Sequence, residues 1–94
     1  MYNMWVEIEY DPTKAGSNLS KHGVSFDEAA TALLDPNGLA QEDIYSEEEE
    51  RWILLGMSAE FRLLVVIYSL PSEDRIRLIS ARPATKTEAK NYAR

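Results

Sequence analysis

The chain has 94 residues, of which 45% are hydrophobic and 28% are charged, and it contains no cysteine. This is the composition of a soluble globular protein, and the length allows one modest core, so residues 1–94 are expected to form one domain. A disulfide framework and a thiolate metal site are excluded, and the longest apolar run, residues 63–68, is far too short to cross a membrane. These features fit a cytoplasmic protein.

The net charge of −6 is unevenly distributed along the chain. Residues 1–50 contain twelve acids against Lys14 and Lys21, whereas residues 51–94 contain eight bases against four acids. This asymmetry suggests an anionic partner for the C-terminal half and a basic partner for the acidic stretch. An equally simple interpretation of this charge asymmetry is that acids and bases mix on a solvated surface after folding.

The N-terminal segment predicts a strand followed by a helix. Residues 4–9 alternate in polarity, so Val6 and Ile8 are expected to point inward. Asp11, followed by proline, is a typical N-cap, and Gly23 is a typical C-terminal glycine for a helix over residues 13–22. The expected buried face of this helix consists of Ala15, Leu19 and His22.

A second helix is predicted to begin at Ser25, where Ser25 and Glu28 have the spacing of a capping box. Asp35 and the proline after it end this helix, and the short link between the two helices predicts a compact helical hairpin. The apolar stripe of the second helix consists of Phe26, Ala29, Ala30, Leu33 and Leu34.

The C-terminal half predicts three strands and a helix, over residues 51–58, 62–69 and 75–82 and from Thr85 onward. Residues 39–45 are ambiguous and could form a frayed edge strand, and the acids at 47–50 fit either a loop or the first turn of a helix. The second strand is apolar on both faces, which is typical of a central strand. The order strand-helix-helix-strand-strand-strand-helix predicts an α+β fold, with an antiparallel sheet and the helical hairpin on one face.

The residues that could carry chemistry are mainly cationic. Arg51, Arg62 and Arg82 all lie at or near expected strand ends, and Arg82 has the same parity as the inward-facing Ile76 and Leu78. Around one sheet end, with Trp52, they would form a phosphate- and base-binding cleft. The simpler alternative is that each arginine pairs with an acid. On the last helix, Lys86, Lys90 and Arg94 form one stripe, and Ala89, Tyr92 and Ala93 are expected to dock on the sheet.

Metal and cofactor chemistry is not expected. His22 is the only histidine, no acids accompany it at helical spacing, and the glycines do not form a phosphate-binding loop. We interpret His22 as a structural residue in the last turn of its helix.

The motifs KHGVSF at residues 21–26 and ISARPAT at residues 79–85 resemble those of BrnT-type toxins. The resemblance covers nearly the whole chain. It includes Asp11-Pro12, Lys14, Asn18-Leu19, Glu28-Ala29, Asp35-Pro36, Glu50-Arg51, Gly56, Arg62-Leu63 and residues 88–92.

The resemblance implies a RelE-like fold and the toxin of a type II toxin–antitoxin pair. Such a toxin is a metal-independent ribonuclease that stops translation. It is neutralised by a BrnA-type ribbon-helix-helix antitoxin, through which the complex binds operator DNA. The implied catalytic residues are Arg62 and Arg82 for transition-state stabilisation, Arg51 as a third phosphate contact, and Tyr92 or Glu50 for proton transfer or orientation. The implied RNA-binding residues are Lys21, Trp52, Lys86 and Lys90.

Two alternatives stay open at this point. The chain could be a catalytically weak or inactive partner and co-repressor of a DNA-binding antitoxin, because an acidic protein is poorly suited to grip RNA. It could also be an unrelated small α+β enzyme that acts on anionic metabolites.

Overall fold

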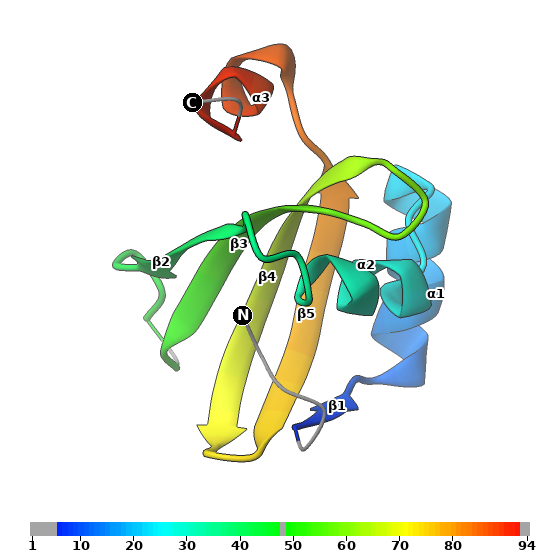
Figure 1. Cartoon of the computed structure of the whole chain (residues 1–94). Coiled ribbons are helices and arrows are strands. Elements are labelled where there is room, and N and C mark those ends of the chain that lie inside the picture. The colour runs from blue at the N-terminus through cyan, green and yellow to red at the C-terminus, as the bar shows by residue number, and fades with distance from the viewer. Residues whose placement is uncertain (1–5, 48, 93–94) are drawn as a thin grey trace.

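The structure is a computed structural model that describes residues 6–47 and 49–92. Met4, Glu48, Ala93 and Arg94, to which some expectations apply, lie outside these residues. The fold is α+β, as predicted, and none of the helices in the described part is long and apolar enough to span a membrane. The elements are β1 (Glu7–Glu9), α1 (Pro12–His22), α2 (Phe26–Ala32), β2 (Leu39–Asp43), β3 (Arg51–Met57), β4 (Leu63–Ser72), β5 (Arg75–Pro83) and α3 (Lys86–Tyr92) (Figure 1).

The five strands form one sheet in the order β1-β5-β4-β3-β2. The apolar strand β4 lies at the centre, as predicted, and the ambiguous segment forms β2, an edge strand paired with β3. The prediction of an antiparallel sheet is wrong at one edge, because β1 runs parallel to β5. No hairpin connects these two strands; most of the chain lies between them, so their relative direction is not set by a tight turn.

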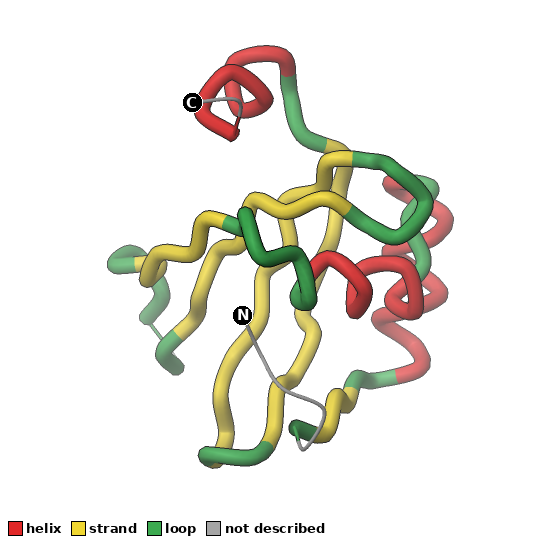
Figure 2. Tube along the Cα trace, viewed as in Figure 1, coloured by secondary structure: helices red, strands yellow, loops and turns green. Residues whose placement is uncertain are grey.

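The helical hairpin covers one face of the sheet, and α3 lies apart at one end of it (Figures 1 and 2). Local sequence explains where both hairpin helices begin and where α1 ends, whereas α2 ends at Ala32, before the Asp35-Pro36 stop that the sequence predicts. Asp11 accepts a hydrogen bond from the Thr13 amide at 2.9 Å, and Gly23 ends α1 with a φ of 68°. The hydroxyl of Ser25 accepts from the Glu28 amide at 3.0 Å at the start of α2. The core between hairpin and sheet comprises Val24, Phe26, Ala29, Ala32, Leu33, Leu54, Leu64, Val66, Tyr68, Ile76, Leu78 and Ala81.

The face of α1 that packs on the sheet differs from the prediction. Ala15 is partly buried, but Leu19 is 52% exposed and His22 is also exposed. Asn18 is buried instead, and its side-chain amide binds the backbone of Ala81 in β5. The prediction failed because it used apolarity to find the buried face, whereas this contact buries an amide that satisfies backbone groups.

The N-terminal strand also buries fewer side chains than expected. Val6 packs against the core, as predicted, but Ile8 is exposed. β1 is an edge strand of three residues, so little of the molecule covers it.

A β-bulge in β5 reverses the predicted direction of Arg82. Tyr68 pairs with Leu78 and Ile67 pairs with Ser80, so Ile79 is an extra residue in β5. Alternation therefore shifts by one position, and the buried residues after the bulge continue at Ala81 rather than at Arg82. Arg82 pairs with Val65 and points to the sheet face opposite the hairpin, which corrects its expected core-facing position.

Candidate functional site

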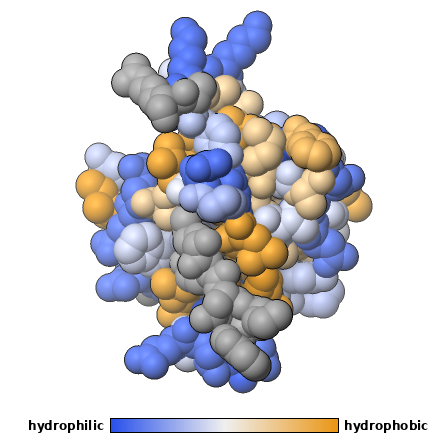
Figure 3. Space-filling view, in the orientation of Figure 1, coloured by the Kyte–Doolittle hydropathy of each residue, from blue (hydrophilic) through white to orange (hydrophobic). Residues whose placement is uncertain are grey.

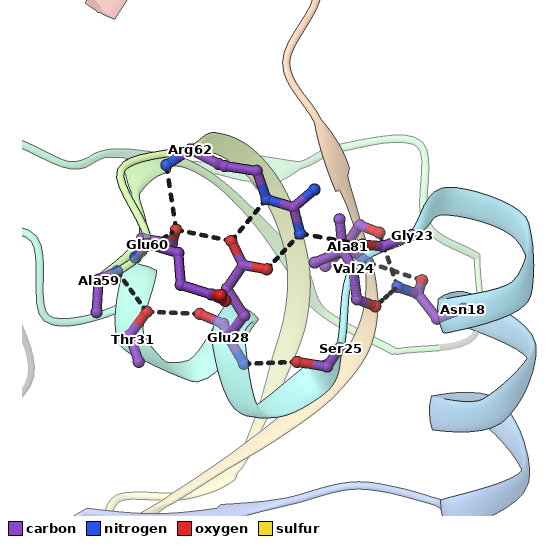
Figure 4. Close-up of polar contacts among 11 residues, drawn as sticks. Asn18, Gly23, Val24, Ser25, Glu28, Thr31, Ala59, Glu60, Arg62 and Ala81 are labelled. Atoms are coloured by element: carbon purple, nitrogen blue, oxygen red, sulfur yellow. Dashed lines mark hydrogen bonds and ion pairs between the residues drawn. The ribbon is translucent and has the colours of Figure 1, made fainter.

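Arg62 binds a buried carboxylate on the helical hairpin (Figure 4). Its Nε donates to Glu28 Oε2 at 2.9 Å, and its Nη2 donates to Glu28 Oε1 and to the carbonyl oxygen of Gly23. The side chain of Glu28 is 3% exposed and that of Arg62 is 42% exposed. The hydrogen bonds from Arg62, supported by the Ser58 hydroxyl, lower the pKa of Glu28 from 4.5 to about 2 although burial opposes this. Arg62 therefore joins the start of β4 to both helices.

The spacing of Ser25 and Glu28 predicts that the Glu28 carboxylate completes a capping box, but this carboxylate binds elsewhere. The backbone amide of Glu28 binds Ser25, as in a capping box, but its carboxylate is bound by Ser58 and Arg62, and the side chain of Glu60 also hydrogen-bonds with it. Thus only one half of the predicted capping box forms. In place of the other half, the Glu28 carboxylate forms an ion pair with Arg62, a residue far away in the sequence. Patterns among neighbouring residues do not predict this pair.

Arg82 binds Glu88 across the start of α3. Nη1 and Nη2 of Arg82 donate to the two carboxylate oxygens of Glu88, each at 2.8 Å. Glu88 also accepts from the Thr85 amide at 2.8 Å, and the Thr85 hydroxyl accepts from the Glu88 amide at 3.1 Å. This is a complete capping box. Arg82 is the main cause that lowers the pKa of Glu88 from 4.5 to about 2, followed by the Thr85 amide.

The other end of α3 is held by Tyr92. Its hydroxyl donates to Asp35 Oδ2 at 2.6 Å, and the amides of Met57 and Asn37 donate to the same carboxylate at 2.8 and 2.9 Å. Burial raises the pKa of Asp35, but these hydrogen bonds outweigh burial and the net pKa is lowered. The hydrogen bond to Asp35 raises the pKa of Tyr92, so the phenol is neutral and acts as a donor. The role of Tyr92 in proton transfer or orientation stays a prediction, and in this structure its phenol is held by Asp35.

A shallow hollow of about 220 Å³ lies on the sheet face opposite the hairpin, between the strands and α3. Its floor is apolar, and Glu88 and Asn91 line it from α3. Because Arg82 binds Glu88, its guanidinium lies at the rim. The lining residues are Leu39, Ala40, Gln41, Ile53, Leu55, Val65, Glu88 and Asn91.

The predicted cluster of three arginines does not form. Arg62 and Arg82 lie at the same end of the sheet, but their side chains reach opposite faces. Arg51 pairs with Ser69, whereas Met57 at the other end of β3 pairs with Leu63 beside Arg62. At about 3.3 Å per residue, Arg51 is roughly 20 Å away along the strand. Its role as a phosphate contact stays a prediction, without support from the geometry.

The other predicted site residues are spread over the surface. Trp52 is partly buried against the core, so it packs there rather than standing free on the surface, and its role in RNA binding stays a prediction. Glu50 is exposed before β3, at the Arg51 end of the sheet. Lys21 is exposed in the last turn of α1, and Lys86 and Lys90 are exposed on α3, where Figure 3 shows hydrophilic side chains projecting at the top of the molecule.

Sequence reasoning missed the acids that hold these groups. Glu28, Asp35 and Glu88 were interpreted as helix signals or motif positions, and each is in fact the partner of a proposed site residue. A signal was available, since all three belong to the motifs quoted above. Among the described residues, no three His, Cys, Asp or Glu side chains lie together as a metal-ion site would require.

Comparison with known proteins decides the family. A family model described as "Ribonuclease toxin, BrnT, of type II toxin-antitoxin system" matches residues 10–88. The chain belongs to the BrnT family of ribonuclease toxins. Because the BrnT toxins belong to type II toxin–antitoxin systems, membership implies an antitoxin partner. A search of curated protein sequences gave no match.

The fold is also that of a solved BrnT. The chain is similar to the crystal structure of the Brucella abortus ribonuclease toxin BrnT, with a TM-score of 0.64 and 22% sequence identity. The similarity covers 86% of this chain and 99% of the Brucella chain. At this level of identity the structural match supports the fold, whereas the family model supports membership of the family.

Proposed function

We propose that this BrnT-family protein cleaves RNA without a metal ion and thereby inhibits translation. The observation that carries this proposal is the family match over residues 10–88. We further propose that the fold is RelE-like, that the protein acts in the cytoplasm, and that a BrnA-type ribbon-helix-helix antitoxin neutralises it and brings the complex to operator DNA.

The proposed reaction is attack of an RNA 2′-hydroxyl on its adjacent phosphate, which expels the 5′-oxygen of the next nucleotide. Charge accumulates on the phosphate oxygens in the transition state, and fixed cationic donors lower the barrier. Arg82 suits this task because Glu88 fixes its orientation at the rim of the hollow. The described contacts of Arg82 use three of the five N–H donors of a guanidinium. Two donors are left for a phosphate.

Arg62 is assigned a secondary role. Its described contacts also use three donors, none of them on Nη1, so this edge can bind a second phosphate. Its other contacts hold the hairpin to the sheet. We therefore expect Arg62 to contribute to both RNA binding and stability, and Arg82 mainly to activity.

The net charge of −6 does not prevent RNA binding at this end of the molecule. Lys86 and Lys90 are exposed on α3 close to Arg82, whereas Glu49 and Glu50 lie at the other end of β3. Exposed charges further apart than about 10 Å are largely screened at physiological salt. The cations on α3 can therefore act locally.

Inducible expression in a bacterium tests the proposal. Wild type is expected to arrest growth and to stop incorporation of labelled methionine, and Arg82→Ala is expected to weaken the arrest at least about 100-fold in inducer sensitivity, as for loss of a transition-state donor. Arg77→Ala is the matched control, because Arg77 is also a half-exposed β5 arginine bound to a carboxylate, that of Glu9. It should arrest growth as wild type does. Co-expression of the antitoxin should restore growth in every case.

A harmless wild type that co-purifies with the product of the adjacent reading frame would instead support an inactive partner and co-repressor. Undiminished arrest by Arg82→Ala would refute the role of Arg82 while leaving the toxin activity in place.

A further inference from the structure

Phe61 is the most exposed large hydrophobic side chain in the described part of the chain. It is 89% exposed, and its φ of 63° lies in the left-handed region. The exposed ring gains nothing from burial, and a non-glycine residue is strained at positive φ, so neither feature contributes to stability. Unfavourable conformations of this kind persist where surrounding contacts enforce them, and they cluster at functional sites.

Hydrogen bonds on both sides fix the turn that presents Phe61, and Figure 4 shows the one between Ala59 and Thr31. The Phe61 amide donates to the carbonyl oxygen of Ser58 at 3.0 Å, and the Ser58 amide donates to that of Arg62 at 2.8 Å. The Ser58 hydroxyl donates to Glu28, and the Ala59 amide donates to the Thr31 hydroxyl at 2.8 Å. The ring is therefore displayed on a rigid support anchored to α2.

The basic residue Arg62 and the acid Glu60, whose charge acts on the Arg62 guanidinium, both belong to this turn, and Lys21 lies in the last turn of α1. Arg62 follows Phe61 directly and binds the carbonyl oxygen of Gly23 at 3.0 Å, which brings the turn against the end of α1. Lys21 and His22 are exposed in that last helical turn. Glu28 is occupied by Arg62, and Glu60 is an exposed acid within the turn. The exposed ring directly precedes Arg62, whose Nη1 makes no described contact, and the turn adjoins the helix end that carries Lys21. This combination suits a base and its phosphate.

We propose that Phe61 is a stacking platform for an unpaired base of the RNA substrate, and that Lys21 and Nη1 of Arg62 hold the adjacent phosphate. This inference rests on the proposed ribonuclease function. Single-stranded RNA is recognised by stacking of splayed bases on exposed aromatic rings, with cations along the backbone. The platform lies at the same sheet end as Arg82 but on the hairpin side, so it would hold RNA that extends beyond the hollow.

Binding to a fluorescent 2′-O-methyl RNA of about ten nucleotides tests the platform, because this probe cannot be cleaved by 2′-hydroxyl attack and its length falls within known single-strand site sizes. Phe61→Leu is expected to weaken binding about 10- to 100-fold, the range given by loss of one stacked base. Phe61→Trp should bind at least as well as wild type. Tyr45→Leu is the matched control, since Tyr45 is 85% exposed elsewhere on the surface and should have no effect.

Phe61→Gly separates binding from folding. Glycine adopts a positive φ without strain, so this variant should unfold at the same temperature as wild type or higher, yet lose affinity as Phe61→Leu does. If wild type binds the probe and both variants bind equally well, the platform is wrong and the ribonuclease proposal stands. If the variants bind the probe normally but lose the co-purifying antitoxin, Phe61 is an antitoxin contact and the platform is again wrong. If wild type neither binds nor cleaves RNA, both proposals fail together.

Discussion

Replacing Arg62 with alanine is expected to lower the free energy of unfolding at neutral pH, because it leaves the buried carboxylate of Glu28 without its cationic partner. The remaining carboxylate of Glu28 is 3% exposed, and Ser58 alone cannot compensate its charge. Glu28→Gln should cost less than half as much, because the half-exposed guanidinium it leaves can be hydrated. Urea unfolding of the two variants beside wild type measures this asymmetry.

The same pair predicts the direction of a pH dependence. The pKa of Glu28 is lowered from 4.5 to about 2 in the folded protein. The pair therefore contributes stability above about pH 4.5 that is lost as the pH falls toward 2. In Arg62→Ala, burial raises the pKa of Glu28, so the gap to wild type should shrink on acidification. Glu88 and its partners are the same in wild type and Arg62→Ala. Its contribution therefore cancels when the two free energies of unfolding are subtracted. A gap that stays constant with pH, or an Arg62→Ala variant as stable as wild type, would contradict the structural role.

Asn18→Ala is expected to lower the free energy of unfolding by about 3 kcal/mol and the melting temperature by more than about 10 °C. The Asn18 amide donates to the carbonyl oxygens of Val24 and Ala81 at 2.9 and 2.8 Å, and its oxygen accepts from the Ala81 amide at 3.0 Å. Alanine leaves these buried backbone groups without that partner. Circular dichroism melting measures the effect.

Ser17→Ala is the control for Asn18→Ala, because Ser17 is the exposed neighbour in α1 and alanine improves helix propensity. It should melt at or slightly above the temperature of wild type. A fall of less than about 1 kcal/mol for Asn18→Ala would show that α1 does not depend on this amide.

The starts of the three helices and the end of α1 could be predicted from the sequence, because they depend on residues close together in the chain. Asp11, Gly23 and Ser25 act where local rules place them, and the fully apolar strand β4 lies at the centre of the sheet. The bulge in β5 depends on pairing with a neighbouring strand, which no local pattern predicts. This bulge, at Ile79, is visible only as a change in the register between β5 and β4. This change turns Arg82 to the other face of the sheet.

The candidate site was also predictable only in part, because its contacts join residues that are distant in the sequence. Periodicity identified Arg62 and Arg82 as cations at strand ends, but it could not show that Glu28 and Glu88 bind them. Arg51 was grouped with them because strand ends look alike in a sequence, and strand direction separates it from the others. The consequence for experiment is direct: loss of activity in Arg62→Ala does not identify a catalytic residue, whereas loss in a folded Arg82→Ala does.

The most direct test is incubation of the purified protein with single-stranded RNA in excess EDTA. We expect wild type and Arg77→Ala to cleave it, leaving 2′,3′-cyclic phosphate ends as attack by the 2′-hydroxyl requires, and we expect the antitoxin to stop the reaction. Arg82→Ala should stay folded under the assay conditions but unfold at a lower denaturant concentration than wild type, because Glu88 loses its bidentate partner. It should cleave at least about 100-fold more slowly. RNA that stays intact with stoichiometric wild-type protein, or that Arg82→Ala cuts at the wild-type rate, would contradict this account.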